Sequence, residues 1–192
     1  MTSRTSTNIK RILIAAVLVL TAAGILFALY WYGFFLPSWI RWEDRTYAMD
    51  FDNDGKIETV TLKDRHVRLE REGELLYEKK EWYVSDMICA DIDHDGITEV
   101  VLLCWNHGDY GISHPFWEKN QYVIFSEHFY IFEVKRDILF PQWMSSKLIP
   151  EIAEWKLNDD MSFTFKEPDG EESTWAWLHW GMERLDQEPG YY

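Results

Sequence analysis

The hydrophobic and polar positions divide the chain into an apolar N-terminal segment and a long region of short, alternating runs. No charged residue occurs within residues 12–36. A helix over the 21 residues 12–32 would be roughly 31 Å long, which matches the hydrocarbon core of a bilayer. The pattern therefore predicts one transmembrane signal anchor within residues 12–36, after a short cytoplasmic tail at residues 1–11.

A cleaved signal peptide is the competing interpretation of this segment. Basic residues precede the apolar run, and residues 21–24 offer small side chains for cleavage. The run continues well past that point, whereas the apolar region of a signal peptide usually covers about 7 to 15 residues, so a retained anchor is favoured. Basic residues flank both ends in nearly equal number, but Lys10 and Arg11 adjoin the run beside the free amino terminus. This favours an extracellular C-terminal domain.

After residue 40 the pattern changes to short apolar and β-branched runs separated by turn signals, and helical periodicity is almost absent. The expected strands cover residues 58–63, 66–71, 75–78, 82–90, 100–105, 121–125, 129–135, 161–166 and 173–180. A Pro-Asp-Gly sequence at 168–170 predicts a tight turn between the last two strands. The predicted fold class is all-β: an N-terminal transmembrane helix followed by an antiparallel β domain at residues 37–192.

Two acidic loops at residues 50–58 and 91–99 interrupt this β pattern with one template, D-x-D-x-D-G-x-x-E. Four carboxylates in so short a segment repel one another strongly unless a cation lies among them, and Ca2+ prefers oxygen ligands. Glycine at position six permits the sharp turn that such a loop needs. The expected calcium ligands are the carboxylates of Asp50, Asp52, Asp54, Glu58, Asp91, Asp93, Asp95 and Glu99, and the backbone carbonyls of Lys56 and Ile97.

The flanks of both loops exclude an EF-hand. An EF-hand needs a helix on each side and a Glu at position twelve, where this chain has Thr61 and Leu102. The flanks are strand-like, so each loop is expected to join two strands. Plain solvated turns are the alternative, because Asp, Asn and Gly favour turns for reasons unrelated to metals. If calcium binds, we expect a structural role rather than a sensing role, outside the cell where calcium is abundant.

A strand, an aspartate-rich loop and a second strand, recurring after 41 residues, resembles the FG-GAP/VCBS repeats of integrin-type β-propellers and of many secreted bacterial proteins. The resemblance is densest at residues 90–103, and the remainder of the chain, through residues 143–146 and 175–181, looks similar to membrane-anchored bacterial proteins. It implies propeller-like units with calcium in both loops. The chain departs from the family in lacking a third acidic loop of this kind. Its length suits about three units of four strands, so an incomplete propeller and a rolled sandwich are both open.

The net charge limits the kinds of partner that the chain can bind, and the cysteine content bears on whether it forms a disulfide. All 33 acidic residues but only 16 of the 19 basic residues follow position 40, which gives that part a net charge of −17. A field of this sign repels phosphate polymers and attracts cations, so we expect no nucleic acid partner. Cys89 and Cys104 are the only cysteines. A hairpin about Asp95 would place them on opposite faces, so we expect two buried thiols rather than a disulfide.

Catalytic motifs such as G-x-S-x-G and H-E-x-x-H are absent from the sequence. We therefore expect a non-enzymatic, single-pass protein of the cell membrane, whose calcium-binding domain interacts with an envelope protein or a polysaccharide. The alternative is a cell-envelope glycan hydrolase or a polysaccharide-binding accessory protein. Aromatic and acidic content favours that alternative, as does a loop at 105–117 rich in glycine and aromatic residues. A sensing partner of another membrane protein is a third interpretation.

Overall fold

The structure is a computed structural model that describes residues 2–80, 82–110, 123–178 and 180–186. Contacts divide the chain into two compact units, Met1–Pro37 and Ser38–Tyr192. Residues 111–117 of the glycine- and aromatic-rich loop lie outside the described residues. So do residues 121 and 122 of the expected strand at 121–125.

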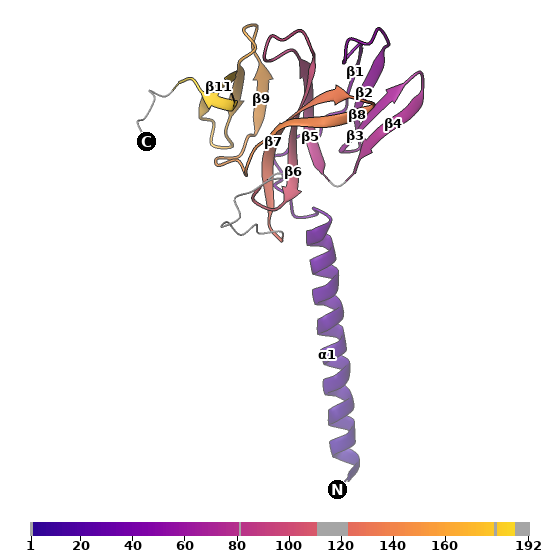
Figure 1. Cartoon of the computed structure of the whole chain (residues 1–192). Helices are drawn as coiled ribbons and strands as arrows, with labels where there is room; N and C mark the ends of the chain where they lie inside the picture. The colour runs from indigo at the N-terminus through magenta and orange to yellow at the C-terminus, as the bar shows by residue number, and fades with distance from the viewer. Residues whose placement is uncertain (1, 81, 111–122, 179, 187–192) are drawn as a thin grey trace. The chain divides into compact units, whose positions relative to one another are not determined.

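The first unit is the helix α1 (Thr2–Trp31), within which Lys10–Trp31 is long and apolar enough to cross a membrane (Figure 1). The helix ends before the predicted limit at residue 36. Gly33 adopts a positive φ of 69°, its N–H donates to Tyr30 O at 2.9 Å, and Phe34 N–H donates to Leu29 O at 2.9 Å. These two bonds and the left-handed glycine form a Schellman motif, which satisfies the last carbonyls and stops the helix.

The second unit contains, within its described residues, three antiparallel sheets of four strands, in which strands adjacent in sequence pair (Figure 1). The first sheet comprises β1 (Arg45–Met49), β2 (Glu58–Lys63), β3 (His66–Arg71) and β4 (Glu74–Lys79). The middle sheet comprises β5 (Tyr83–Ala90), β6 (Glu99–His107), β7 (Phe125–Lys135) and β8 (Ile138–Met144). The third sheet comprises β9 (Glu154–Leu157), β10 (Phe163–Lys166), β11 (Glu172–Leu178) and β12 (Gly181–Arg184).

The middle sheet is buried on both faces. The first seven residues of β6 and nine consecutive residues of β7 are buried. One face packs Leu102 and Tyr130 against Val60 and other residues of the first sheet. The opposite face packs Val101 against Phe163 and other residues of the third sheet. A strand covered on both sides is apolar at nearly every position, which explains the continuous run in β6.

The outer two sheets alternate instead, and their outward faces are polar. In β2 the buried Val60 and Leu62 alternate with Thr61 and the exposed Lys63. In β10 the buried Phe163 and Phe165 alternate with less buried Thr and Lys residues. Three layers therefore enclose two cores, and the described strands form neither a closed barrel nor a closed ring. The prediction of three antiparallel four-stranded units is confirmed.

The strands that the pattern failed to predict are β1, β8, β9 and β12, and each lies at the edge of a sheet. An edge strand pairs on one side only and is often short and half exposed, so its apolar signal is weak. The burial of β1 and β9 fits this, because neither contains a fully buried residue. By contrast, β2 and β3 begin and end where predicted, and the turn at 168–170 joins β10 to β11.

Both cysteines are free, as expected, but the prediction that they lie on opposite faces of the hairpin is wrong. Cys89 pairs with Val100 across β5 and β6, and both Cys89 and Cys104 pack into the core beside the first sheet. The positions 100 and 104 are four residues apart on one strand, which separates the thiols by roughly 13 Å. Only Cys104 is fully buried, and distance along the strand prevents a disulfide.

Truncating a side chain of the middle sheet should destabilise the domain strongly. Leu102→Ala removes a fully buried side chain and should lower the free energy of unfolding by about 2–5 kcal/mol. Thr61→Ala, on the outward face of β2, should change it by less than about 0.5 kcal/mol. Denaturant titration of the full chain in detergent measures both. Equal effects would contradict burial of Leu102 between the middle sheet and the first sheet.

Candidate functional site

The two acidic loops adopt the same backbone conformation, which their shared template encodes. The Asp50 carboxylate accepts hydrogen bonds from the backbone N–H groups of Asp54 and Gly55, at 3.0 and 2.9 Å. The Asp91 carboxylate accepts the two equivalent bonds in the second loop, at 3.1 and 3.0 Å. The glycine at position six has a φ of 88° in both loops, a conformation that a side chain would strain.

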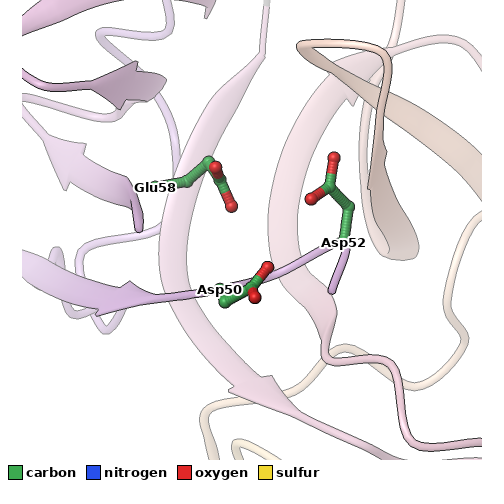
Figure 2. Close-up of side chains that lie close together, drawn as sticks. All are labelled: Asp50, Asp52 and Glu58. Carbon is green, nitrogen blue, oxygen red and sulfur yellow. The ribbon is translucent and has the colours of Figure 1, made fainter. Parts of the chain in front are cut away.

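Three carboxylates converge in each loop. The first group is Asp50, Asp52 and Glu58 (Figure 2), and the second is Asp91, Asp93 and Glu99. Within each group, one carboxylate oxygen of every residue lies within 4.8 Å of one from each of the other two. The glutamate is the first residue of the following strand, β2 or β6, and is fully buried in both cases. A compact group of carboxylate oxygens is the donor set that hard divalent cations prefer.

The third aspartate of each loop is not part of these groups. Asp54 accepts a hydrogen bond from the Lys56 backbone N–H at 2.9 Å, and Asp95 accepts the equivalent bond from Ile97 at 2.7 Å. The Lys56 N–H is also the main cause that lowers the pKa of Asp54. The structure therefore brings together six of the eight predicted carboxylates. The carbonyls of Lys56 and Ile97 stay predicted ligands.

A buried apolar residue at position two of each loop anchors the glutamate. Phe51 and Ile92 lie in the two cores. Their backbone N–H groups donate to Oε2 of Glu58 at 3.0 Å and of Glu99 at 2.8 Å, respectively. Oε2 of each glutamate is thus held by the backbone of its loop. What the glutamate can bind in addition depends on the groups around Oε1.

The surroundings of the two Oε1 atoms differ. Glu58 Oε1 accepts a hydrogen bond from Arg71 Nε at 2.8 Å. Glu99 Oε1 is buried and has no hydrogen-bond partner among the described residues. Burial is the main cause that raises the pKa of Glu99 to about 8. A buried carboxylate oxygen left without a donor and placed beside two further carboxylates fits a divalent cation.

Strand pairing explains the difference between the glutamates. Glu58 lies opposite Arg71 in the β2–β3 pair, whereas Glu99 lies opposite Glu133 in the β6–β7 pair. Glu133 in turn forms an ion pair with Lys135 at 2.5 Å. Arg71 lies outside the loop template and is not among the predicted site residues, although a two-residue turn between the predicted strands 58–63 and 66–71 places it opposite Glu58.

Two further contacts of the loops come from tertiary structure and had no sequence signal. Asn53 Nδ2 in the first loop donates to Gly96 O in the second at 3.0 Å, so the loops lie side by side. Gln142 Nε2 in β8 donates to Asp93 Oδ2 at 3.0 Å. The second loop is therefore held by the first loop and by the far edge of its own sheet.

A polar cavity of about 180 Å³ lies apart from the loops and is lined by Trp39, Arg45, Asp86, Glu127 and Trp155, among others. The Asp86 carboxylate accepts hydrogen bonds from Arg45 Nε and from Trp155 Nε1, both at 2.9 Å. Because these residues belong to β5, β1 and β9, one carboxylate connects all three sheets. The nearly fully buried Glu127 accepts a hydrogen bond from the Ile152 N–H.

A larger groove of about 410 Å³ is lined by aromatic side chains of the middle and third sheets, among them Phe129, Trp143, Phe165 and Trp175. Its size falls in the range of small-molecule pockets, and its walls are more apolar than those of the polar cavity. Phe129 and Phe165 are buried in the core, whereas the half-buried Trp143 and Trp175 offer rings that suit stacking with a ring-shaped ligand.

Comparisons with protein-family models, with curated proteins and with solved structures found no match for this chain. The resemblance to FG-GAP/VCBS repeats therefore stays a prediction, and the site has to be judged by its own geometry.

The buried Glu127 should make stability depend on pH. Burial raises its pKa from 4.5 to about 8. The folded chain then keeps a proton that the unfolded chain releases between these values, so the free energy of unfolding should fall as pH rises through this window. The contribution is at most about 1.4 kcal/mol per pH unit.

Denaturant titrations between pH 5 and pH 8, in excess chelator, test this effect. Glu127→Gln cannot ionise and should show a smaller fall than the wild-type chain. Glu171→Gln, which changes an exposed carboxylate, is the matched control and should follow the wild type. An unchanged slope in Glu127→Gln would contradict the assignment.

Proposed function

We propose that this protein is a single-pass membrane protein whose extracellular β domain binds a divalent cation, with calcium the expected ion. The domain serves as an interaction or ligand-binding module at the cell envelope. The observation that carries the proposal is the buried Oε1 of Glu99, which has no hydrogen-bond partner in the described part of the chain and lies beside the carboxylates of Asp91 and Asp93. A protein seldom leaves such an atom without a partner, and a hard cation is the partner that its neighbours favour.

The position of the loop supports a structural role for the ion. Asp91 and Asp93 follow β5, and Glu99 begins β6, so an ion held among them would tie together two strands of the middle sheet. Folding and ion binding are coupled when the ligands come from separate elements that only folding brings together. The ion would also relieve repulsion within a region of net charge −17.

The extracellular location is supported by the apolar helix and by the chemistry of the loop. Lys10–Trp31 can cross a membrane, and Lys10 and Arg11 adjoin the apolar run beside the amino terminus. Calcium loops of extracellular modules bind with dissociation constants of about 0.1–1 mM, which suits a compartment rich in calcium.

The likeness to FG-GAP/VCBS units is part of the proposal. Each sheet is a four-stranded meander, and in the first two sheets the acidic loop lies between the first and second strands. The equivalent turn of the third sheet, between β9 and β10, is short and closed by a hydrogen bond from Asn158 N to Ser162 O at 2.8 Å. This supports three propeller-like units of an incomplete propeller, the third without a calcium loop. The aromatic groove offers such a module a surface for an envelope ligand such as a polysaccharide.

Calcium should stabilise the full chain in detergent. At a concentration of about 100 times the dissociation constant, binding raises the free energy of unfolding by about 2.7 kcal/mol. Asp93→Asn should abolish most of this gain. Asp64→Asn is the matched control, because it removes the same charge in a turn with a φ of 51°, which Asn tolerates. Thermal unfolding with calcium, with magnesium and with chelator measures the effect. No response to calcium at millimolar concentrations would exclude the cation site.

Labelling of intact cells should establish the orientation. Asp169→Cys introduces a thiol in the exposed β10–β11 turn and should react with a membrane-impermeant maleimide. Ser6→Cys, before the apolar run, should react only after the cells are permeabilised. The chain without either substitution gives the background from Cys89 and Cys104. The opposite labelling pattern would place the β domain in the cytoplasm.

A further inference from the structure

We propose that the two acidic loops, which share one template, have different chemistry: the loop at 91–99 holds the divalent cation, and in the loop at 50–58 the guanidinium of Arg71 takes the cation's place. This inference rests on the proposed cation-binding function. It differs from the sequence-based prediction, which assigned calcium to both loops.

The guanidinium of Arg71 forms ion pairs with three carboxylates, as a bound cation would. Its Nε lies 2.8 Å from Glu58 Oε1, its Nη1 lies 2.6 Å from Asp137 Oδ1, and its Nη2 lies 3.6 Å from Asp54 Oδ2. The side chain is 16% exposed and that of Glu58 is fully buried, so water screens the pair weakly. Arginine stays protonated at any physiological pH. The charge is therefore permanent.

In this arrangement both oxygens of Glu58 already have a hydrogen-bond donor. Oε2 accepts the Phe51 N–H at 3.0 Å, and Oε1 accepts Arg71 Nε. An ion that approached Oε1 would have to displace the guanidinium and would be repelled by its charge at short range. The donor set of the first loop therefore does not fit a divalent cation while Arg71 is in place.

The second loop has the opposite surroundings. The residue opposite Glu99 is Glu133 rather than an arginine, and the contact of Asp93 with β8 is made by the neutral amide of Gln142. Glu99 Oε2 accepts the Ile92 N–H, but Oε1 keeps no partner among the described residues. The same backbone conformation therefore presents a free buried oxygen in one loop and a neutralised oxygen in the other.

The contact between the loops indicates what the first loop does instead. Asn53 has a φ of 56°, within a loop that backbone hydrogen bonds and the ion pairs of Arg71 hold in shape. Its Nδ2 donates to Gly96 O at 3.0 Å, at the turn of the second loop. The first loop is thus a metal-independent brace that holds the ion-binding loop in position.

Stoichiometry tests the inference. Equilibrium dialysis of the full chain in detergent against calcium should give one ion per chain for the wild type. Glu58→Gln should keep that ion, and Glu99→Gln should lose it. Arg71→Gln removes the internal cation and should allow a second ion to bind. Two ions on the wild-type chain, or loss of the ion in Glu58→Gln alone, would overturn the assignment.

A second variant covers the case in which Arg71→Gln does not fold. Asn53→Gly tolerates the positive φ but removes the amide donor, and should weaken calcium binding about tenfold without changing the stoichiometry. Met161→Gly is the matched control for added backbone freedom, because Met161 has a φ of 62° in the β9–β10 turn. An unchanged affinity for calcium in Asn53→Gly would contradict the proposal that the first loop holds the second in position.

The outcomes separate this inference from the proposed function. If no variant, including the wild type, binds calcium, the proposed cation-binding function fails. If the wild type binds two ions, the function stands and the distinction between the loops fails. One ion that depends on Glu99 and not on Glu58 supports both.

Discussion

The structure depends on the coverage of both faces of the middle sheet. A sheet whose central strands contain continuous apolar runs, at residues 100–105 in β6 and 129–132 in β7, must bury both of its faces. Here it does so against two sheets whose outward faces are polar.

The same coverage gives the candidate cation site its character. Glu99 begins a strand of the middle sheet and is enclosed by the core shared with the third sheet, so water does not reach its carboxylate. Glu58 begins a strand of an outer sheet and is equally buried, but the adjacent strand supplies Arg71. Two loops of one template therefore differ through a residue that neither loop contains, namely the one opposite the glutamate. Motif matching examines the loop and overlooks this residue.

How far the sequence predicts the structure depends on where each residue obtains its partners. The strands β2 and β3 could be predicted to the residue, because alternating burial and a two-residue turn are local signals. The edge strands β1, β8, β9 and β12 could not, since pairing on one side leaves a weak apolar pattern. The Asp and Glu positions of the site could likewise be predicted from the template. Asn53 and Gln142 could not, because their contacts with Gly96 and Asp93 exist only after separate segments have packed.

Asp86 has a mechanical consequence for a domain that follows a helix long and apolar enough to cross a membrane. A pull on the chain from α1 reaches the sheets before β1, where Arg41 pairs with Glu154 of β9 at 2.8 Å and the Glu43 N–H donates to Ser85 O of β5 at 2.9 Å. It then reaches β1, whose first residue is Arg45. The Arg45 guanidinium passes that load to Asp86 in β5, and the Trp155 indole shares it with β9. Tension would therefore be distributed over all three sheets rather than separate β1 from β2. The Asp86 carboxylate is the atom group through which that force passes between the sheets.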